Sequence, residues 1–176
     1  MTEAEFLALP ETEQRMELLD GDVILSPAPT NVHQVLVGAL HIALHEWAVA
    51  HPPAFVGLSP FDVRIAPNRV VQPDLFLLFD GLPSKQLLRR PPDLVIEALS
   101  TNRSYDRLAK RLVYAEAGVG EYWIVDARLR RIEVVAREDY RIEAERCESA
   151  VASGLGIDLP ALFAPLDAIP ENDPPG

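Results

Sequence analysis

Two nearly continuous apolar runs constrain this chain more than any other feature. "VQPDLFLLF" covers residues 71–79 and "PDLVIEALS" covers residues 92–100, and the runs carry the carboxylates of Asp74 and Glu97. Such runs are typical of strands at the centre of a sheet, where both faces are buried. A carboxylate there is costly to desolvate and survives by pairing, hydrogen bonding or binding a cation. The runs therefore predict a buried sheet with polar chemistry on two of its strands.

Turn and helix signals on both sides of these runs predict the remaining elements. Asp20-Gly21 indicates a hairpin within residues 16–29, and apolar residues at spacings of three and four indicate a helix over 31–51, ended by Pro52-Pro53. Residues 101–118 have an amphipathic helical pattern that stops at Gly118. A short capped helix is expected at Thr2. Further strands are expected at 54–58, 61–66, 121–127, 131–138 and 140–147, with a weaker one near 148–153.

This order of elements predicts an α/β (α+β) protein with a mixed β-sheet flanked by helices and an N-terminal β-hairpin. At 176 residues the chain is long enough for one domain with a proper core, which we expect over residues 1–168. Residues 169–176 are rich in proline and acids, and we expect a disordered tail there.

The charge pattern restricts the partners. A net charge of −11 argues against loose binding to nucleic acids, which depends on neutralising phosphates. Between Lys85 and Arg131, however, ten basic residues outnumber six acidic ones, so this segment carries +4 and the remainder −15. A locally basic face can still meet a phosphate backbone. For any single arginine, an ordinary solvated surface position is an equally good interpretation.

The sequence also bears on the cellular environment. No apolar stretch approaches the roughly 20 residues that a membrane-spanning helix needs, so we expect no membrane association. The first residues carry acids where a signal peptide would have a basic end. Cys147 is the single cysteine, which excludes an internal disulfide and a cysteine-rich metal site. A cytoplasmic location is therefore expected.

The two carboxylates suggest a metal site. Strand alternation puts Val95, Glu97 and Leu99 on one face. If Asp74 and Glu97 lie on neighbouring strands, they repel each other when ionised, and a divalent cation removes that repulsion. Oxygen ligands with waters completing an octahedron suit Mg²⁺.

The helix after the second run adds a cation. If it packs over the sheet, Lys110 can lean toward Glu97, and its ammonium could hold an attacking water or neutralise charge on a phosphate. Asp106 lies four residues before Lys110 and can pair with it, although such pairs are most often ordinary surface pairs. Tyr114 continues the same helical row, as core or as a hydrogen-bond partner of the site.

Together these residues resemble the Uma2 family of the PD-(D/E)xK nuclease superfamily. The resemblance rests on Pro73-Asp74, on Glu97 in "LVIEALS", and on "YDRLAKRLVYAEAGVGEYWIVD" at 105–126. The hairpin and His33-Gln34 resemble the family's amino-terminal half. The resemblance covers roughly residues 2 to 136.

The resemblance implies a restriction-endonuclease-like core and hydrolysis of DNA phosphodiester bonds that depends on Mg²⁺ (or Mn²⁺). Asp74 and Glu97 would be metal ligands, with the carbonyl of Ala98 as a third. Glu17 corresponds to the acid that precedes the core and would hold a metal-bound water. The resemblance also puts His33 near the site.

One position departs from the superfamily pattern. The lysine expected two residues after the second acid is replaced by Leu99. In Uma2-like proteins a lysine from the following helix takes its place, which here is Lys110. Arg103 and Arg107 on the basic segment are expected to contact the nucleic acid backbone.

Two alternatives to the nuclease stay open at this stage. The protein could be a binding or interaction module that keeps the fold without turnover, and the acidic body and Leu99 favour that reading. A zinc hydrolase using His41 and His45, which are four residues apart, is a third class. A homodimer is expected if both strands of a duplex are cut, because two cuts need two sites.

Overall fold

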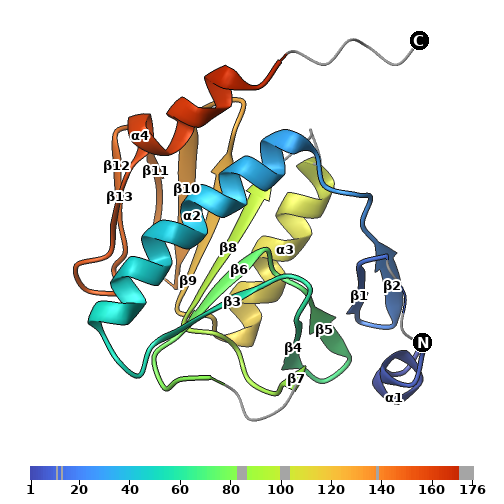
Figure 1. Ribbon diagram of the computed structural model, residues 1–176. Coiled ribbons are helices and arrows are strands. Elements are labelled where there is room, and N and C mark those ends of the chain that lie inside the picture. Colours follow the sequence, from blue (N-terminus) through green and yellow to red (C-terminus); the bar gives the residue numbers. More distant parts are fainter. Residues whose placement is uncertain (11, 13, 83–86, 100–103, 138, 171–176) are drawn as a thin grey trace.

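The computed structural model describes residues 1–10, 12, 14–82, 87–99, 104–137 and 139–170, with the backbone alone for 104–109. Figure 1 shows the arrangement of its elements. Their order along the chain is α1 (Glu3–Leu7), β1 (Met16–Leu19), β2 (Asp22–Leu25), α2 (Asn31–Ala50), β3 (Phe55–Leu58), β4 (Asp62–Ala66), β5 (Arg69–Val71), β6 (Leu75–Leu78), β7 (Leu87–Leu88), β8 (Leu94–Leu99), α3 (Ser104–Ala117), β9 (Glu121–Asp126), β10 (Arg131–Ala136), β11 (Tyr140–Glu143), β12 (Arg146–Glu148), β13 (Gly156–Asp158), α4 (Leu159–Phe163) and the 3-10 helix η1 (Ala164–Ala168).

The described strands form two main sheets and a small ribbon. The larger sheet has six strands in the order β11-β10-β9-β8-β6-β3, and the smaller one has five in the order β2-β1-β5-β4-β7. β12 and β13 form the ribbon. In the larger sheet β8 and β9 are parallel, whereas the other neighbours are antiparallel. Parallel neighbours need a crossover connection, and α3 supplies it. The expected mixed sheet flanked by helices is therefore confirmed.

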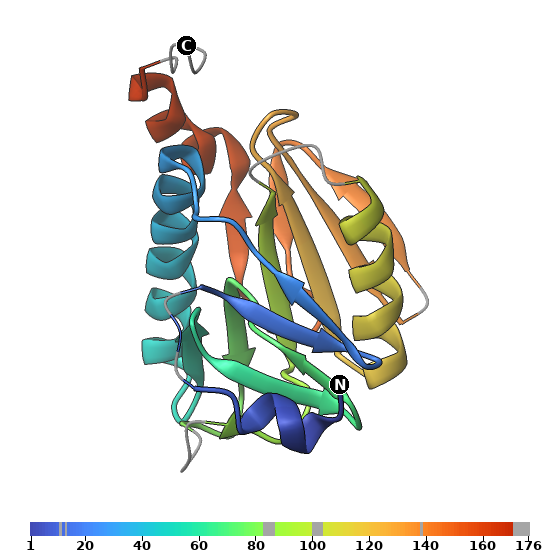
Figure 2. The same cartoon turned by 90° about the vertical axis from the view of Figure 1, so that its right-hand side faces the viewer.

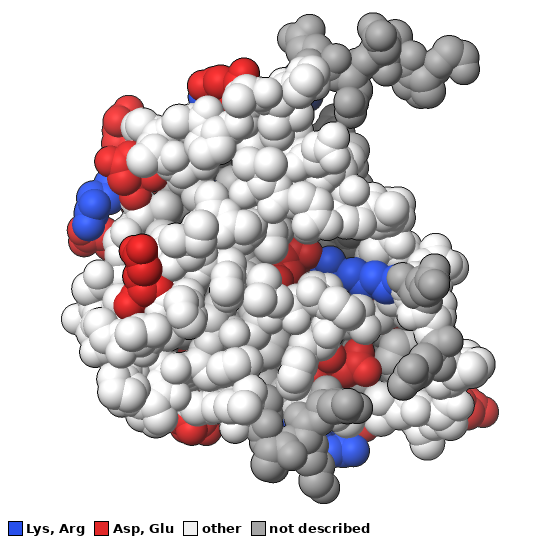
Figure 3. All heavy atoms as spheres, viewed as in Figure 1, with Lys and Arg blue, Asp and Glu red and all other residues white. Residues whose placement is uncertain are grey.

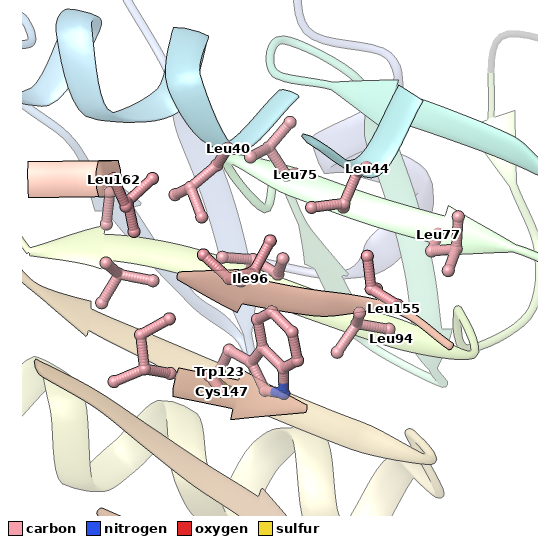
Figure 4. Close-up of a cluster of buried hydrophobic side chains, with 14 of the residues drawn as sticks. Leu40, Leu44, Leu75, Leu77, Leu94, Ile96, Trp123, Cys147, Leu155 and Leu162 are labelled. Atoms are coloured by element: carbon pink, nitrogen blue, oxygen red, sulfur yellow. The ribbon is translucent and has the colours of Figure 1, made fainter. Parts of the chain in front are cut away.

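Helix α2 covers one face of the larger sheet and α3 covers the other (Figure 2). The apolar residues of α2 recur at spacings of four, and Leu36, Leu40 and Leu44 are completely buried. They pack with sheet residues such as Ile96 and Trp123 in the main hydrophobic core, to which α4 also contributes (Figure 4).

Alternation along β8 sorts its side chains between the two faces. Leu94 and Ile96 belong to the core under α2, whereas Val95 packs with Val113 and Tyr114 on the α3 side. Glu97 follows the same alternation as Val95, so its side chain lies between the larger sheet, α3 and the smaller sheet. This alternation was predicted and is confirmed.

The predicted strand over 71–79 is wrong, because it divides into two strands of different sheets. β5 belongs to the smaller sheet and β6 to the larger one, and Gln72, Pro73 and Asp74 lie between them. Pro73 has no N–H group and cannot donate a ladder hydrogen bond, so an uninterrupted central strand is unfavourable at this point. Asp74 consequently lies at the junction where the chain passes from one sheet to the other.

The carboxy-terminal region also differs from expectation. The strand predicted over 140–147 is interrupted and forms β11 and β12. The strand predicted near 148–153 is absent from this described segment, where Leu155 donates its N–H to Ala152 and Gly154 has a φ of 81°. That tight turn carries the chain into β13 instead. Helix α4, capped by Asp158, was not predicted, and β7 lies in a segment for which no strand was predicted.

Most local predictions of the first half are confirmed. Thr2 and Glu5 form the expected capping box on α1, α2 has nearly the predicted bounds, and Asp20 and Gly21 close the hairpin with positive φ values of 52° and 101°. Such φ values at both central residues are the geometry of a tight hairpin turn. Most of the predicted tail, residues 171–176, lies outside the described residues.

Candidate active site

A cleft of about 680 Å³ opens where the two sheets meet the beginning of α2. Its lining combines charged groups of the sheets with the proline-rich segment that leads into α2. The lining residues are Thr12, Gln14, Arg15, Ser26, Pro27, Ala28, Pro29, His33, Gln34, Val37, Ser59, Pro60, Gln72, Asp74, Glu97, Ala98, Leu99, Lys110 and Tyr122. On the face shown in Figure 3, most visible atoms belong to neither acidic nor basic side chains.

Asp74 is fixed at the sheet junction by three hydrogen-bonding groups. Its Oδ2 accepts the backbone N–H of Ala98 at 2.9 Å and lies 3.0 Å from Nε2 of His33, while its Oδ1 is 2.6 Å from Nη1 of Arg15. The register between β6 and β8 pairs Leu75 with Ile96, which brings Asp74 beside the end of β8. The carboxylate is only 3% exposed.

These contacts keep Asp74 ionised. Burial alone would raise its pKa, but the hydrogen bond with His33, the charge of Arg15 and the Ala98 N–H outweigh burial and lower the pKa to about 2. The carboxylate is therefore negative at any physiological pH.

Glu97 divides its two oxygens between the protein interior and the cleft. Oε1 accepts hydrogen bonds from Nζ of Lys110 and from the hydroxyl of Tyr114, each at 2.9 Å. Oε2 lies 3.5 Å from Nη2 of Arg15. Burial raises the pKa of Glu97, and Lys110 opposes this, whereas the neighbouring charge of Asp74 adds to it.

Lys110 connects the larger sheet to the hairpin. Its Nζ lies 2.9 Å from Glu97 and 3.0 Å from Oε2 of Glu17 on β1, and the residue is 8% exposed. Burial would lower the pKa of Lys110, but the charges of Glu17 and Glu97 outweigh burial and raise it. Glu17 also accepts the N–H of Gln72 at 2.8 Å. The ammonium is therefore charged and held by carboxylates from both sheets.

Arg15 is the site residue that the sequence analysis missed. Its guanidinium reaches Asp74 at 2.6 Å, Glu97 at 3.5 Å and Glu17 at 3.6 Å, and Nη2 also donates to the carbonyl of Gln72. Arg15 precedes β1, two residues before Glu17. Spacing of two along an extended segment puts side chains on one face, and this was the signal that could have found it.

The structure brings together most of the residues named from the sequence. Asp74, Glu97, Lys110, Glu17, His33 and Tyr114 are joined by the contacts above, and Ala98 lines the same cleft. Arg103 lies outside the described residues. Asp106 and Arg107 lie in α3, but their side chains are outside the description, so their predicted roles stay predictions.

The two histidines of the zinc reading lie elsewhere. His41 and His45 stack on α2 with ring centroids 5.7 Å apart. Among the described residues, no group of three His, Cys, Asp or Glu side chains is arranged to hold a metal ion. The structure therefore gives the zinc hydrolase no support.

The carboxylate cluster suits a different cation. Asp74 and Glu97 both contact one guanidinium, so their oxygens face a common cationic position. Mg²⁺ is usually held by one or two carboxylates together with carbonyls and waters, not by a cage of side chains. The donor set of Asp74, Glu97 and the Ala98 carbonyl fits Mg²⁺ or Mn²⁺ by this chemistry.

The mixed sheet, the helices on both of its faces and the carboxylate–lysine cluster define an α/β protein with a restriction-endonuclease-like core. The chain belongs to the Uma2 family, whose model, described as "Putative restriction endonuclease", matches residues 3–162.

A solved structure has the same fold. It is the crystal structure of a "putative nuclease belonging to DUF820" from Anabaena variabilis, which is 21% identical. It aligns with a TM-score of 0.81 over 93% of this chain and 98% of that one. No curated protein matches the sequence. None of the helices in the described part of the chain has the length and apolar character to traverse a membrane.

Proposed function

We propose that this protein is a Mg²⁺-dependent endonuclease that hydrolyses phosphodiester bonds of DNA. The observation that carries the proposal is the position of Lys110, whose Nζ lies 2.9 Å from Glu97 while Asp74 is fixed beside the same strand. Membership in a family described as a putative restriction endonuclease, and the likeness of fold to a putative nuclease, support the same class of reaction.

Asp74 and Glu97, with the carbonyl of Ala98, would hold the metal ion. When bound, such an ion supplies Lewis-acid polarisation of a phosphoryl oxygen and lowers the pKa of a coordinated water. Asp74 suits this role because its lowered pKa leaves it ionised, with no proton to be displaced. Mn²⁺, which accepts the same oxygen ligands, is the expected substitute.

Lys110 would orient the attacking water and stabilise the charge that develops on the phosphoryl group. An ammonium has three N–H donors. Glu97 and Glu17 occupy two of them, which leaves one for a water or a phosphate oxygen in the cleft that Lys110 lines. The raised pKa of Lys110 makes it a permanent hydrogen-bond donor and electrostatic stabiliser, not a general base.

The surrounding residues have supporting roles in this proposal. Tyr114 fixes Oε1 of Glu97 and so directs Oε2 toward the cleft. Glu17 positions Lys110 and, with it, the attacking water. His33 holds Asp74 through Nε2, and its place on the cleft wall suits contact with substrate.

Contacts to the nucleic acid backbone would come from the basic segment, including Arg103 and Arg107. Backbone contacts position a duplex without reading its sequence. The face in Figure 3 carries few basic side chains. Binding through such contacts is expected to weaken as the salt concentration rises, with a slope proportional to the number of phosphates contacted. A homodimer that would cut both strands stays a prediction.

The test is cleavage of supercoiled, linear and single-stranded DNA in Mg²⁺ or Mn²⁺. Wild-type protein would be compared with Asp74→Asn and Lys110→Met, and Asp167→Asn would serve as a control because Asp167 pairs with Arg130 at an exposed site. We expect cleavage by the wild type and the control alone. Equal cleavage by all four proteins would identify a contaminant and remove the support for an enzyme.

A second candidate is a binding module that keeps the fold without turnover. The observation that favours it is Arg15, whose guanidinium already neutralises Asp74 and Glu97. Calorimetric titration with Mn²⁺ separates the two candidates. Binding that is lost in Glu97→Gln supports the enzyme, whereas no binding to the wild type or to a variant lacking Arg15 supports the module.

A further inference from the structure

We propose that Arg15 is an internal counter-ion that occupies the metal position between Asp74 and Glu97 and must withdraw before a divalent cation binds. The inference rests on the proposed function, because it concerns the regulation of the same site. It assigns to Arg15 a role in competition with the metal ion.

The geometry of Arg15 is that of a substitute for a metal ion. One guanidinium spans Oδ1 of Asp74 at 2.6 Å and Oε2 of Glu97 at 3.5 Å, and these are the oxygens left free by the other contacts of the two carboxylates. Oδ2 of Asp74 is taken by Ala98 and His33, and Oε1 of Glu97 by Lys110 and Tyr114. Arg15 and a metal ion would therefore use the same two oxygens.

Charge makes simultaneous occupation unfavourable. Asp74, Glu97 and Glu17 contribute three negative charges, and Arg15 and Lys110 contribute two positive ones. A divalent cation added to this set would make the cluster net positive, whereas exchange of Arg15 for the cation would make it neutral. Buried clusters that carry uncompensated charge are costly, so exchange is favoured over addition.

Arg15 is also placed where withdrawal is feasible. It precedes β1, and only its backbone carbonyl is held in the hairpin, by the N–H of Ser26 at 3.0 Å. Its side chain is 21% exposed and lines the open cleft. Its buried Nε lacks a hydrogen-bond partner, so the guanidinium is held through its two Nη groups. A swing of the side chain toward the cleft breaks those contacts without disturbing the backbone of the sheet.

The experiment is calorimetric titration of Mn²⁺ into Arg15→Gln and wild-type protein without DNA. Arg69→Gln is the matched control, because Arg69 binds Asp20 and Glu116 outside the cleft. We expect Arg15→Gln to bind Mn²⁺ about tenfold more tightly than wild type, which corresponds to 1.4 kcal/mol of lost competition. The control should stay within roughly twofold of wild type.

The outcomes distinguish the two proposals. If the wild type binds Mn²⁺ and Arg15→Gln binds it equally or more weakly, the counter-ion role is overturned while the metal-dependent function stands. If neither protein binds Mn²⁺, both proposals fail. Thermal unfolding gives a second readout, because a ligand that binds only the folded state stabilises it by an amount that grows with the logarithm of its concentration divided by Kd. The rise in Tm with added Mn²⁺ should be larger for Arg15→Gln.

Wild-type protein offers a measurement that needs no stable variant. The side-chain N–H signals of Arg15 can be followed by NMR during titration with Mg²⁺, which is diamagnetic. We expect them to shift and to exchange faster with water as the guanidinium leaves the carboxylates. Signals that stay unchanged while Mg²⁺ binds would show that Arg15 remains in place, contrary to the proposal.

Discussion

Tyr114 and Lys110 contact the same oxygen of Glu97, each at 2.9 Å, from two positions one turn apart on α3. Oε1 is thereby saturated by two donors, and Oε2 is directed to the cleft. The helix thus fixes which face of the carboxylate is presented to a ligand. The role of Tyr114 can therefore be tested by measuring protein stability, without an assay of activity.

Replacement of Tyr114 by Phe should destabilise the protein measurably. The hydroxyl is fully buried and donates to a charged group, so its loss should lower the free energy of unfolding by about 1.5–3 kcal/mol in urea denaturation. Tyr140→Phe is the matched control, because Tyr140 is exposed. An unchanged urea midpoint for Tyr114→Phe would show that the hydrogen bond contributes nothing to stability.

Lys110→Met should lower the free energy of unfolding strongly at neutral pH and less in acid. Glu97 and Glu17 would be left buried without the ammonium, a defect that typically costs about 3–5 kcal/mol. Since burial already raises the pKa of Glu97, protonation of this carboxyl on acidification should remove much of the penalty. Urea denaturation at pH 7 and pH 4.5 measures the difference. A loss that is equal at both pH values would contradict this account.

Asp74 should make the protein sensitive to strong acid. Its pKa falls from 3.8 to about 2 on folding, so its stabilising contribution is complete above pH 4 and is lost as the pH falls toward 2. This shift in pKa corresponds to roughly 2 kcal/mol of the free energy of unfolding. Urea denaturation from pH 5 to pH 2 should show this extra loss in the wild type and not in Asp74→Asn. Parallel curves for the two proteins would refute the assignment.

The hydrogen bond from His33 should lower the pKa of Asp74 directly. This hydrogen bond is the largest of the contributions that lower the pKa of Asp74, so His33→Ala should raise that pKa from about 2 toward the ordinary value. Carboxyl ¹³C NMR titration of Asp74 measures this shift. His45→Ala, at an exposed position of the same helix, should leave the titration unchanged. Coincident titrations for wild type and His33→Ala would exclude the coupling.

Local signals predicted much of this fold because the interactions that fix those elements are local. The capping box at Thr2, the Asp20-Gly21 turn and the spacing of Leu36, Leu40 and Leu44 are all contained in short windows. The division of residues 71–79 between two strands was missed because the segment is apolar almost throughout. Pro73 was the one residue in it that argued against a continuous strand. Assignment of β5 and β6 to different sheets depends on contacts far away in the sequence.

For a similar reason, the sequence predicted some residues of the site and missed another. Asp74, Glu97 and Lys110 are conspicuous because each interrupts an apolar pattern or matches the family resemblance. Arg15 interrupts nothing: it lies in a polar segment, and its partners Asp74 and Glu97 are 59 and 82 residues away. The spacing of two places Arg15 on the same face as Glu17, but its contacts with Asp74 and Glu97 depend on how the two sheets pack together, which local patterns do not specify.

The passage of the chain from one sheet to the other at Gln72–Asp74 ties the assembly of the carboxylate–lysine cluster to completed folding. Lys110 is positioned by Glu17 from one sheet and by Glu97 from the other, so neither sheet alone assembles the cluster. In a nascent or heat-damaged copy whose two sheets are separated, Lys110, Glu17 and Glu97 no longer lie together. If the proposed function holds, we expect such copies to lack nuclease activity.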